Sequence, residues 1–491
     1  MWAFDETFYQ IYPLGLCGAP LEAPAVGDDA AAAEQRAHHR ILRLLDWVDH
    51  LERLGVGAVL LNPVFASDSH GYDTRDFHEL DCRLGTNDDL RRVVAALHGR
   101  GIRVVLDAVL NHVGRGFWAF RDVLARRESS PYLHWFNVSL DGDSPYGDGL
   151  WYEGWEGHYE LVKLNLANPE VADYLLDCVR SWHDELGIDG LRLDVAYCLD
   201  RGFMGRLRQL ADELSGMAPG AAGDVPPVPG TALRSHPDDH SFALIGEMLH
   251  GDYAQVVNDG LLHSCTNYEC YKGLYSSLNS LNLFEIAHSL HRQFGPDPWC
   301  IYRGLHLMSF ADNHDVSRLA TILQEPRHVP VAYGLLFGMP GIPCVYYGSE
   351  WGIEGAKVPG TDAPLRPELA VPEWNVLTSW IQSLAEARMG SRALCWDAYR
   401  NVVITNKQLV FERVVGEGEG DEAVPGGGRP AERVLVAVNA DAEPFCVRDA
   451  SLVGTFEVLV SNADGFDAGA TLLLDGSLEL SAYGVVYLRQ A

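Results

Sequence analysis

The stretch LGIDGLRLDVAY, residues 186–197, contains a short apolar run that carries two opposite charges, Arg192 and Asp194. Side chains alternate along a β-strand, so these two positions share one face. The other face is expected to carry Leu191, Leu193 and Val195. Charges inside a buried strand are costly unless they are paired. The run is therefore expected to be an enclosed strand that delivers both charges to one site.

Seven further apolar runs recur along the first 390 residues, separated by stretches with helical periodicity. Residues 33–55 predict one long helix, and a second has Asn168 as its N-cap, Pro169 as its first residue and Gly187 as its stop. Eight strands that alternate with helices predict a parallel (β/α)8 barrel. The eight runs span residues 7–12, 57–62, 102–109, 190–195, 242–248, 264–268, 305–310 and 342–347.

Three segments depart from this alternation. An aromatic-rich connection after the third strand predicts a small inserted domain on the face where strand-to-helix loops emerge. The Pro/Gly/Ala-rich segment 215–239 joins a helix to a strand, so we expect it on the opposite face. The last hundred or so residues are rich in short strands and predict an antiparallel β-sandwich. The predicted domains are the barrel at 1–110 and 168–390, the inserted domain at 111–167 and the C-terminal sandwich at 391–491.

The composition argues against several classes of partner. The 491 residues include 37 Lys and Arg and 68 Asp and Glu, a formal net charge of −31, which disfavours nucleic acid and anionic membranes. The N-terminus is acidic where a secretory signal is basic, and no apolar run is long enough to span a bilayer, so we expect a cytoplasmic protein. The ten cysteines show neither a Cys-x-x-Cys pair nor zinc-type Cys/His spacing. We therefore expect free, mostly buried thiols and no metal site.

Polar residues gather at the carboxyl ends of the predicted barrel strands, where the catalytic groups of such barrels lie. A single acid or histidine at a strand end is more often a helix cap or a satisfied polar residue. Three acids around one site, in contrast, raise one another's pKa and need a compensating reason. The residues in question are Asp107, Asn111, His112, Arg192, Asp194, Glu247, His314, Asp315 and Arg318.

Cleavage of a glycosidic bond requires such an arrangement, because it uses one ionised carboxylate and one protonated carboxyl. Arg192 is expected to keep Asp194 ionised by charge pairing. Partial desolvation beside other acids is expected to raise the pKa of Glu247 toward that of a general acid. The residues thus predict two carboxyl groups with different roles.

The motifs that contain these residues resemble those of glycoside hydrolase family 13, the α-amylase family. The resemblance extends over the barrel, the inserted domain and the C-terminal sandwich, and it implies a retaining enzyme that acts on α-linked sugars. The matching stretches are GVGAVLLNPV (55–64), HGYDTRDF (70–77), DAVLNH (107–112), GLRLDVA (190–196), GEM (246–248), NHD (313–315) and GIPCVYYGSE (341–350).

Carried over position by position, the resemblance implies Asp194 as nucleophile, Glu247 as acid/base, and Asp315 as a third acid that binds sugar hydroxyls and distorts the reacting ring. The implied substrate-binding residues are Arg192, His112, His314, Tyr72, Asp362 and Arg366. Arg192, His112 and His314 would contact the nucleophile or the reacting glucose. Tyr72 would stack beneath that glucose. The last two would hold the next sugar inward.

Within the family, three features resemble the neopullulanase, cyclomaltodextrinase and maltogenic amylase group. They are LVKLNLANPEV (161–171), GFWAFRDVLARRESSPYLHWF (116–136), and IDGLRLDVA followed by Asp200 and Phe203. Three differences accompany them. The barrel begins within the first dozen residues, where that group usually has an N-terminal β-domain, and Leu249 stands where the group has a tryptophan near the leaving-group side. The loop after the first strand, PLGLCGAPLEAPAVGDD, lacks the Asn/Asp cluster that binds calcium in several relatives, so we expect no cofactor.

Three functions are consistent with these features. The first is hydrolysis of α-1,4 bonds in short maltodextrins, cyclodextrins or related α-glucans, with an oligosaccharide as the partner. The second is transglycosylation, phosphorolysis or isomerisation, because a covalent first step is common to all of them. The third is non-catalytic carbohydrate binding on the same barrel, against which Arg192 beside the three acids argues. The sequence predicts no particular oligomeric state.

Overall fold

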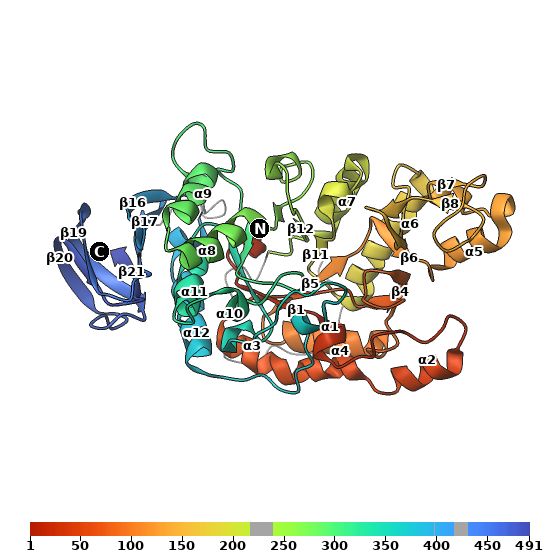
Figure 1. Ribbon diagram of the computed structural model, residues 1–491, viewed down its shortest axis with the longest axis horizontal. Coiled ribbons are helices and arrows are strands. Elements are labelled where there is room, and N and C mark those ends of the chain that lie inside the picture. The colour runs from red at the N-terminus through yellow and green to blue at the C-terminus, as the bar shows by residue number, and fades with distance from the viewer. Residues whose placement is uncertain (217–238, 397, 417–430) are drawn as a thin grey trace.

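The computed structural model describes residues 1–216, 239–396, 398–416 and 431–491. Figure 1 shows three parts arranged along one axis: an antiparallel sheet near the C-terminus at one end, a barrel in the middle, and a small lobe with β7 and β8 at the other end. Most of the Pro/Gly/Ala-rich segment 215–239 lies outside the described residues. The domain boundaries drawn from the sequence stay predictions.

Eight parallel strands form the barrel, and each predicted run contains one of them. A parallel bridge between Thr266 and Met308 joins the two ends of the sheet, which closes it. The predicted (β/α)8 barrel is thereby confirmed. The strands are β1 (Phe8–Ile11), β2 (Ala58–Leu61), β5 (Arg103–Ala108), β11 (Gly190–Leu193), β12 (Ala243–Gly246), β13 (Ser264–Cys265), β14 (Met308–Phe310) and β15 (Ile342–Tyr346).

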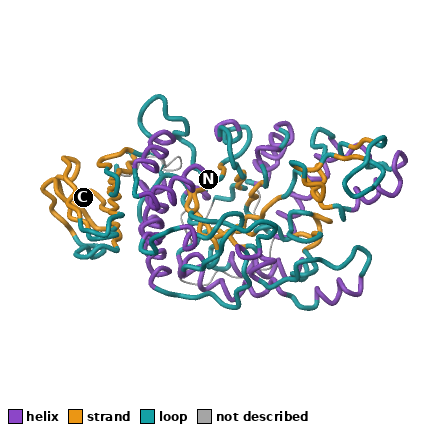
Figure 2. The backbone as a smooth tube through the Cα atoms, in the orientation of Figure 1, coloured by secondary structure: helices purple, strands orange, loops and turns teal. Residues whose placement is uncertain are grey.

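Helices cover the outside of the barrel (Figures 1 and 2). The second predicted helix is confirmed in detail, because the side chain of Asn168 accepts a hydrogen bond from Glu170 N and Gly187 ends the helical segment with a φ of 76°. The helices of the barrel region are α1 (Pro13–Leu16), α2 (Asp29–Arg36), α3 (Val48–Leu54), α4 (Asn87–His98), α6 (Pro169–Ser181), α7 (Arg201–Leu214), α8 (Tyr268–Ser280), α9 (Phe284–Phe294), α10 (Leu319–Ile322), α11 (His328–Gly338), α12 (Val376–Met389) and α13 (Arg392–Cys395).

Two predictions about the helices were wrong. Residues 33–55 are not one helix, because α2 ends at Arg36, His39 takes a positive φ of 48°, and a 3₁₀ segment precedes α3. The connection from β12 to β13 contains only a 3₁₀ turn, Tyr253–Gln255, where regular alternation requires a full helix. Gly251, with a φ of 97°, lies just before that turn and favours a loop there.

The strand that carries Arg192 ends earlier than predicted. β11 stops at Leu193, where its pairing with β5 and β12 also ends, and Val195 has a left-handed φ of 41°. The expectation that Val195 continues the apolar face was therefore wrong. Its backbone N–H instead donates to the carboxylate of Glu247, at 3.2 Å. The chain thus turns directly after Asp194, which places this carboxylate at the carboxyl end of the barrel.

A small lobe lies between β5 and α6. Its strands form a three-stranded sheet in the order β6-β10-β9 and a β7–β8 pair, and Phe136 and Tyr152 are buried against Phe120 of its helix. The lobe joins the barrel at His112, the first residue of β6. Its elements are β6 (His112–Gly114), α5 (Trp118–Arg126), β7 (Val138–Ser139), β8 (Trp151–Tyr152), β9 (Gly154–Trp155) and β10 (His158–Lys163). A further hairpin, β3 (Phe65–Ser67) with β4 (Thr74–Leu80), follows β2.

The C-terminal part is a six-stranded antiparallel sheet in the order β16-β17-β18-β21-β19-β20. All six strands pack side chains into one apolar cluster. Where the sequence predicted a sandwich, the strands are hydrogen-bonded into a single sheet that surrounds this core. The other face contacts α11, where the Tyr487 hydroxyl donates to Gly334 O at 2.6 Å. The strands are β16 (Arg400–Ile404), β17 (Gln408–Val415), β18 (Glu432–Asn439), β19 (Phe445–Ser461), β20 (Thr471–Leu480) and β21 (Val485–Gln490).

Two expectations from the composition can be compared with the fold. Within the described ranges, no helix combines the length and the apolar character needed to cross a bilayer. All ten cysteines are free, as predicted; five are buried and Cys446 alone is exposed.

Candidate active site

The guanidinium of Arg192 lies at the centre of the charged groups at the carboxyl end of the barrel. Its Nη1 is 2.7 and 2.8 Å from the two carboxylate oxygens of Asp107 and 3.1 Å from Asp194 Oδ1. Its Nη2 is 2.6 Å from Glu247 Oε1. These acids come from the ends of the neighbouring strands β5, β11 and β12. One buried cation therefore pairs with three buried carboxylates, which offsets the cost of placing an arginine in this strand.

A second layer of contacts starts at Asp107. Its Oδ2 accepts hydrogen bonds from Asn62 Nδ2 at 3.0 Å and from the Tyr72 hydroxyl at 2.9 Å. The same hydroxyl is 2.5 Å from His314 Nε2, and the rings of Tyr72 and His314 stack at 5.7 Å. Tyr72 therefore connects the acids around Arg192 to the residues that follow β14.

Asp315 lies in this second group with Asp362 and Arg366. One oxygen of Asp315 is 2.9 Å from His314 Nε2, and the other is 3.1 Å from Arg366 Nη2. The same Nη2 is 2.9 Å from Asp362 Oδ2, and Lys357 Nζ is 2.7 Å from Asp362 Oδ1. A third of the Asp315 side chain remains exposed, whereas Asp194 and Glu247 are buried. Solvent therefore reaches Asp315 most easily among the three predicted catalytic acids.

His112 is buried beside the predicted nucleophile. Its Nε2 is 3.8 Å from Asp194 Oδ2, too far for a hydrogen bond, and has no hydrogen-bond partner within the described part of the chain. Asn111 Nδ2 lies 3.2 Å from its other ring nitrogen. Burial lowers the pKa of His112 to about 3, so the ring is neutral at neutral pH. The neutral ring therefore presents an unused Nε2 next to Asp194.

The pKa values of the three acids differ in direction. Burial raises the pKa of Asp194 well above its usual value, against the opposing charge of Arg192, and burial likewise raises the pKa of Glu247. Burial would also raise the pKa of Asp315, but His314 and Arg366 outweigh it and hold that pKa well below its usual range. Asp194 and Glu247 therefore hold their protons to higher pH than free carboxyl groups do, whereas Asp315 is ionised.

This arrangement corrects one expectation. The sequence predicted that Arg192 keeps Asp194 ionised, as if the guanidinium served that carboxylate alone. In the structure its charge is shared with Asp107 and Glu247, so a single positive charge opposes the burial of three acids. In the absence of substrate, burial dominates the pKa of Asp194.

The structure brings the three implied catalytic acids and the six implied substrate-binding residues into one region. Arg192, Asp194, Glu247 and His112 form the first group, and Asp315, His314, Tyr72, Asp362 and Arg366 form the second. Their roles toward a substrate stay predictions.

Two residues of this network were missed by the sequence analysis. Gln10 Nε2 lies 3.0 Å from both Asn62 Oδ1 and His314 Nδ1, and so joins the first, second and seventh barrel strands. Gln10 and Asn62 are the polar positions of the runs TFYQIY and GAVLLN. A polar residue in an apolar strand was the same signal that identified Arg192.

Most of the chain matches a known protein family. The family described as "Alpha amylase, catalytic domain" matches residues 43–401, nearly three quarters of the chain. The chain belongs to the α-amylase family. The predicted family is confirmed, and the match spans the strands from β2 to β15 that carry the charged groups.

Three relatives within the α-amylase family illustrate the match. A cyclomaltodextrinase of Bacillus sp is 30% identical over 73% of this chain and 61% of its own length. An intracellular maltogenic amylase of Bacillus subtilis is 28% identical over 73% of this chain and 57% of its own length. The chain thus spans about three fifths of the curated relatives it matches. The ligand-free cyclic α-maltosyl-(1→6)-maltose hydrolase of Arthrobacter globiformis superposes with a TM-score of 0.74 at 25% identity, and each chain is covered completely.

The residues after Glu247 differ from the group that the sequence resembles. Met248 is buried, and its N–H donates to Thr266 Oγ1 at 2.9 Å, whereas Leu249 is 41% exposed. An apolar side chain therefore faces solvent two positions after Glu247.

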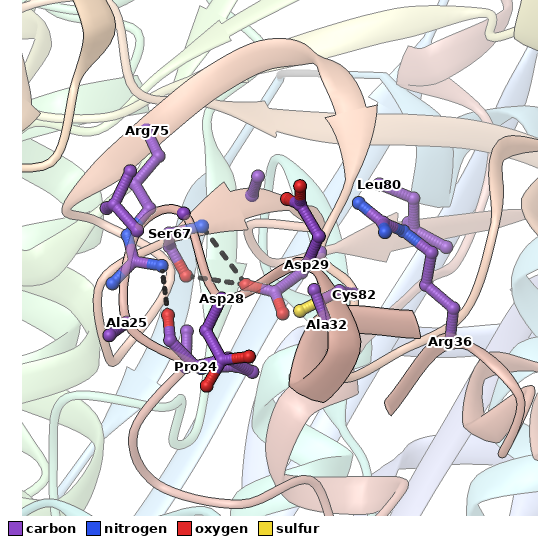
Figure 3. Close-up of a pocket in the computed structure, with 15 residues that line it drawn as sticks. Pro24, Ala25, Asp28, Asp29, Ala32, Arg36, Ser67, Arg75, Leu80 and Cys82 are labelled. Atoms are coloured by element: carbon purple, nitrogen blue, oxygen red, sulfur yellow. Dashed lines mark hydrogen bonds between the residues drawn. The ribbon is translucent and has the colours of Figure 1, made fainter. Parts of the chain in front are cut away.

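The loop after β1, where several family members bind calcium, borders a hollow of about 120 Å³ (Figure 3). Three of the polar groups around it have partners: Asp28 accepts from Ala31 N, Ser67 donates to Asp81, and Arg75 donates to Pro24 O. The contact between Arg75 and Pro24 O holds the loop against the β3–β4 hairpin. The expectation that calcium does not bind here stays a prediction.

Proposed function

We propose that this protein is a retaining α-glycoside hydrolase that cleaves α-1,4-glucosidic bonds in short maltodextrins, cyclodextrins or related α-glucans. The observation that carries the proposal is the convergence of Asp194 and Glu247 on the guanidinium of Arg192. A retaining glycosidase needs one carboxyl group as nucleophile and a second as acid at the same bond. The names of the relatives, a cyclomaltodextrinase and a maltogenic amylase among them, support the choice of substrates.

In the first step, a carboxylate oxygen of Asp194 attacks the anomeric carbon while Glu247 gives its proton to the glycosidic oxygen. The bond to the leaving sugar breaks, and an ester with Asp194 forms. In the second step, Glu247 takes a proton from water, and the water oxygen attacks the same carbon and releases Asp194. Two inversions retain the α-configuration. The raised pKa of Glu247, caused by burial against the opposing charge of Arg192, favours the protonated acid that the first step uses.

The second group of residues would bind the sugar. Asp315 is ionised and partly exposed, so its oxygens can accept hydrogen bonds from sugar hydroxyls when these displace His314 or Arg366. The unpartnered Nε2 of His112 is a further contact for a hydroxyl or for Asp194.

The proposal is tested by hydrolysis of maltotriose and of a nitrophenyl α-glucoside. We expect turnover by the wild type, release of the α-anomer as the first product by NMR, and loss of turnover in Asp194→Asn and Glu247→Gln. Asp88→Asn, at a carboxylate that is 83% exposed on α4, is the matched control and is expected to retain activity. Undiminished turnover in either of the first two variants would contradict the proposal.

The same experiment separates the other candidate functions. Added phosphate or an excess of acceptor sugar should leave the products unchanged if water is the acceptor. A sugar phosphate or a longer oligosaccharide would instead indicate phosphorolysis or transglycosylation, and rearrangement of one disaccharide into another would indicate isomerisation. Binding of maltotriose without turnover would indicate a carbohydrate-binding protein.

We also propose that the protein acts in the cytoplasm, on oligosaccharides and not on nucleic acid or membranes. The net charge of −31 and the relative named as an intracellular enzyme support this proposal. Fractionation of cells that express the full chain tests it, and recovery in the medium or the membrane fraction would contradict it.

A further inference from the structure

A cluster of potential metal ligands lies at the end of α9, outside the proposed active site. His291 is on the last turn of the helix, and Asp297 and Cys300 are in the loop that follows. A ring nitrogen of His291, a carboxylate oxygen of Asp297 and the Cys300 sulfur all lie within 4.8 Å of one another. The proposed mechanism uses none of these three residues.

The local backbone explains why three positions so close in sequence converge. Cys300 N donates to Asp297 O at 3.0 Å, and this turn points both side chains back to the helix end. A Cβ at Gly295 would be 2.5 Å from the carbonyl oxygen of His291, 2.9 Å from His291 Nδ1 and 3.0 Å from Cys300 Sγ. A glycine at this position therefore keeps open the space beside the imidazole and the thiol.

Hydrogen bonds within the cluster already bring His291 Nε2 and Asp297 together, so an ion between them would take the place of their shared proton. His291 Nε2 is 2.8 Å from Asp297 Oδ2, whereas Nδ1 is buried and has no hydrogen-bond partner among the described residues. The Cys300 thiol donates to the carbonyl oxygen of His291 at 3.0 Å. All three side chains are partly exposed, so an ion has access to them.

We propose that His291, Asp297 and Cys300 form a binding site for a divalent transition-metal ion of the zinc class. Thiolate, imidazole and carboxylate are the ligands that zinc takes in proteins, and three of them leave the fourth tetrahedral position to water. On binding, the thiol loses its proton to solvent and a metal–sulfur bond replaces the S–H bond, without any change of oxidation state. Calcium and magnesium prefer oxygen ligands and are expected to bind weakly or not at all.

The cluster lies close to the loop that follows Glu247. Tyr302, two residues after Cys300, stacks on Tyr253 at 5.0 Å, and its hydroxyl accepts a hydrogen bond from Tyr253 N at 3.1 Å. Tyr253 belongs to the loop that follows Glu247 and contains no full helix. An ion at the end of α9 would therefore restrain the loop beside the proposed acid/base, and we expect it to raise the melting temperature of the chain.

Cobalt provides the test, because a thiolate ligand gives Co²⁺ a near-ultraviolet charge-transfer band. The full chain is freed of metal with a chelator, dialysed and titrated with CoCl₂. We expect one bound cobalt ion per chain with this band, displacement of the cobalt by ZnCl₂, and no displacement by CaCl₂. Absence of the band at stoichiometric cobalt, or its loss on adding CaCl₂, would overturn the proposal.

Variants assign the band to the cluster. Cys300→Ser should abolish it, and Asp297→Asn should weaken cobalt affinity by about tenfold or more. Cys446→Ser, at the exposed cysteine of β19, and His158→Gln, at a surface histidine 3.0 Å from Glu160, are matched controls that should keep the band. A band that persists in Cys300→Ser, or disappears in Cys446→Ser, would overturn the assignment. Thermal melting of each metal-free variant checks that it is folded.

Discussion

Two buried arginines, Arg83 and Arg192, have their positive charge compensated in different ways. Arg83 is fully buried and forms a two-bond ion pair with Asp81, and its remaining N–H groups donate to Ser67 Oγ and to three backbone carbonyls. Arg192 instead contacts three carboxylates. The first cluster is electrically balanced, whereas the second carries an excess of negative charge.

The difference shows which cluster serves the fold and which serves chemistry. Around Arg83, one cation, one anion and neutral acceptors satisfy every group, and the result ties the loop after β1 to the β3–β4 hairpin. Around Arg192, burial raises the pKa of two acids and the neighbouring acids raise it further, a state that folding alone does not require. We therefore expect substitutions in the first cluster to change stability, and substitutions in the second to change activity.

The largest effect is expected for Asp194→Asn. Loss of the nucleophile should lower kcat on maltotriose by at least about 10⁴-fold, as removal of a catalytic nucleophile does elsewhere. The same change removes one surplus negative charge beside Arg192, so the melting temperature should stay constant or rise. Steady-state kinetics and thermal melting of the same preparation measure both. A clear fall in melting temperature would contradict the view that the Arg192 cluster serves activity and the Arg83 cluster stability.

Arg83→Met should mainly destabilise the protein. It leaves the carboxylate of Asp81 buried without its cation, which costs about 3–5 kcal/mol of unfolding free energy. Urea denaturation measures this loss. Arg180→Met is the control, because its ion pair with Glu213 is exposed and is worth less than about 1 kcal/mol. Equal losses of unfolding free energy in the two variants would show that the Arg83 cluster stabilises the fold no more than an exposed ion pair does.

Asp107→Asn should shift the pH dependence of activity. The negative charge of Asp107 contributes to the raised pKa of Glu247, so its removal lowers that pKa. The acid then loses its proton at a lower pH, and the basic limb of the kcat/KM profile should move toward lower pH. A shift toward higher pH would contradict the role assigned to charge excess in this cluster.

The smallest effect is expected for Ser67→Ala. Ser67 Oγ donates to Asp81 Oδ2 at 2.8 Å and accepts from Arg83 Nη2 at 2.7 Å, so its loss should cost about 1 kcal/mol of unfolding free energy. We expect kcat to be unchanged. Urea denaturation and kinetics check both, and a loss of kcat without a loss of stability would link this cluster to catalysis.

Much of the barrel could be predicted from the sequence, because each buried strand is a short apolar run and the charged residues inside it are conspicuous. Arg192 was found in this way. Gln10 carries the same signal but was missed, since an uncharged amide in a four-residue strand has many ordinary explanations. Val195 was misplaced because a β-branched residue favours a strand, whereas in the structure the chain turns there and Val195 N bonds Glu247 from another strand.

The remaining gaps have similar causes. The sharing of Arg192 among three acids depends on which strands are neighbours, and that is a property of the closed barrel. The cluster at His291 escaped notice because one of its three members is an aspartate, which carries no spacing signature of its own.

The network around His314 also constrains how the chain folds. Gln10 and His314 touch although 304 positions separate them, and Arg192 reaches Asp107 across 85 positions. Contacts of such long range form only after the loops between them have closed, which is slow and comes late in folding. We therefore expect enzymatic activity to return last during refolding, so that it reports completion of the barrel more faithfully than helix content does.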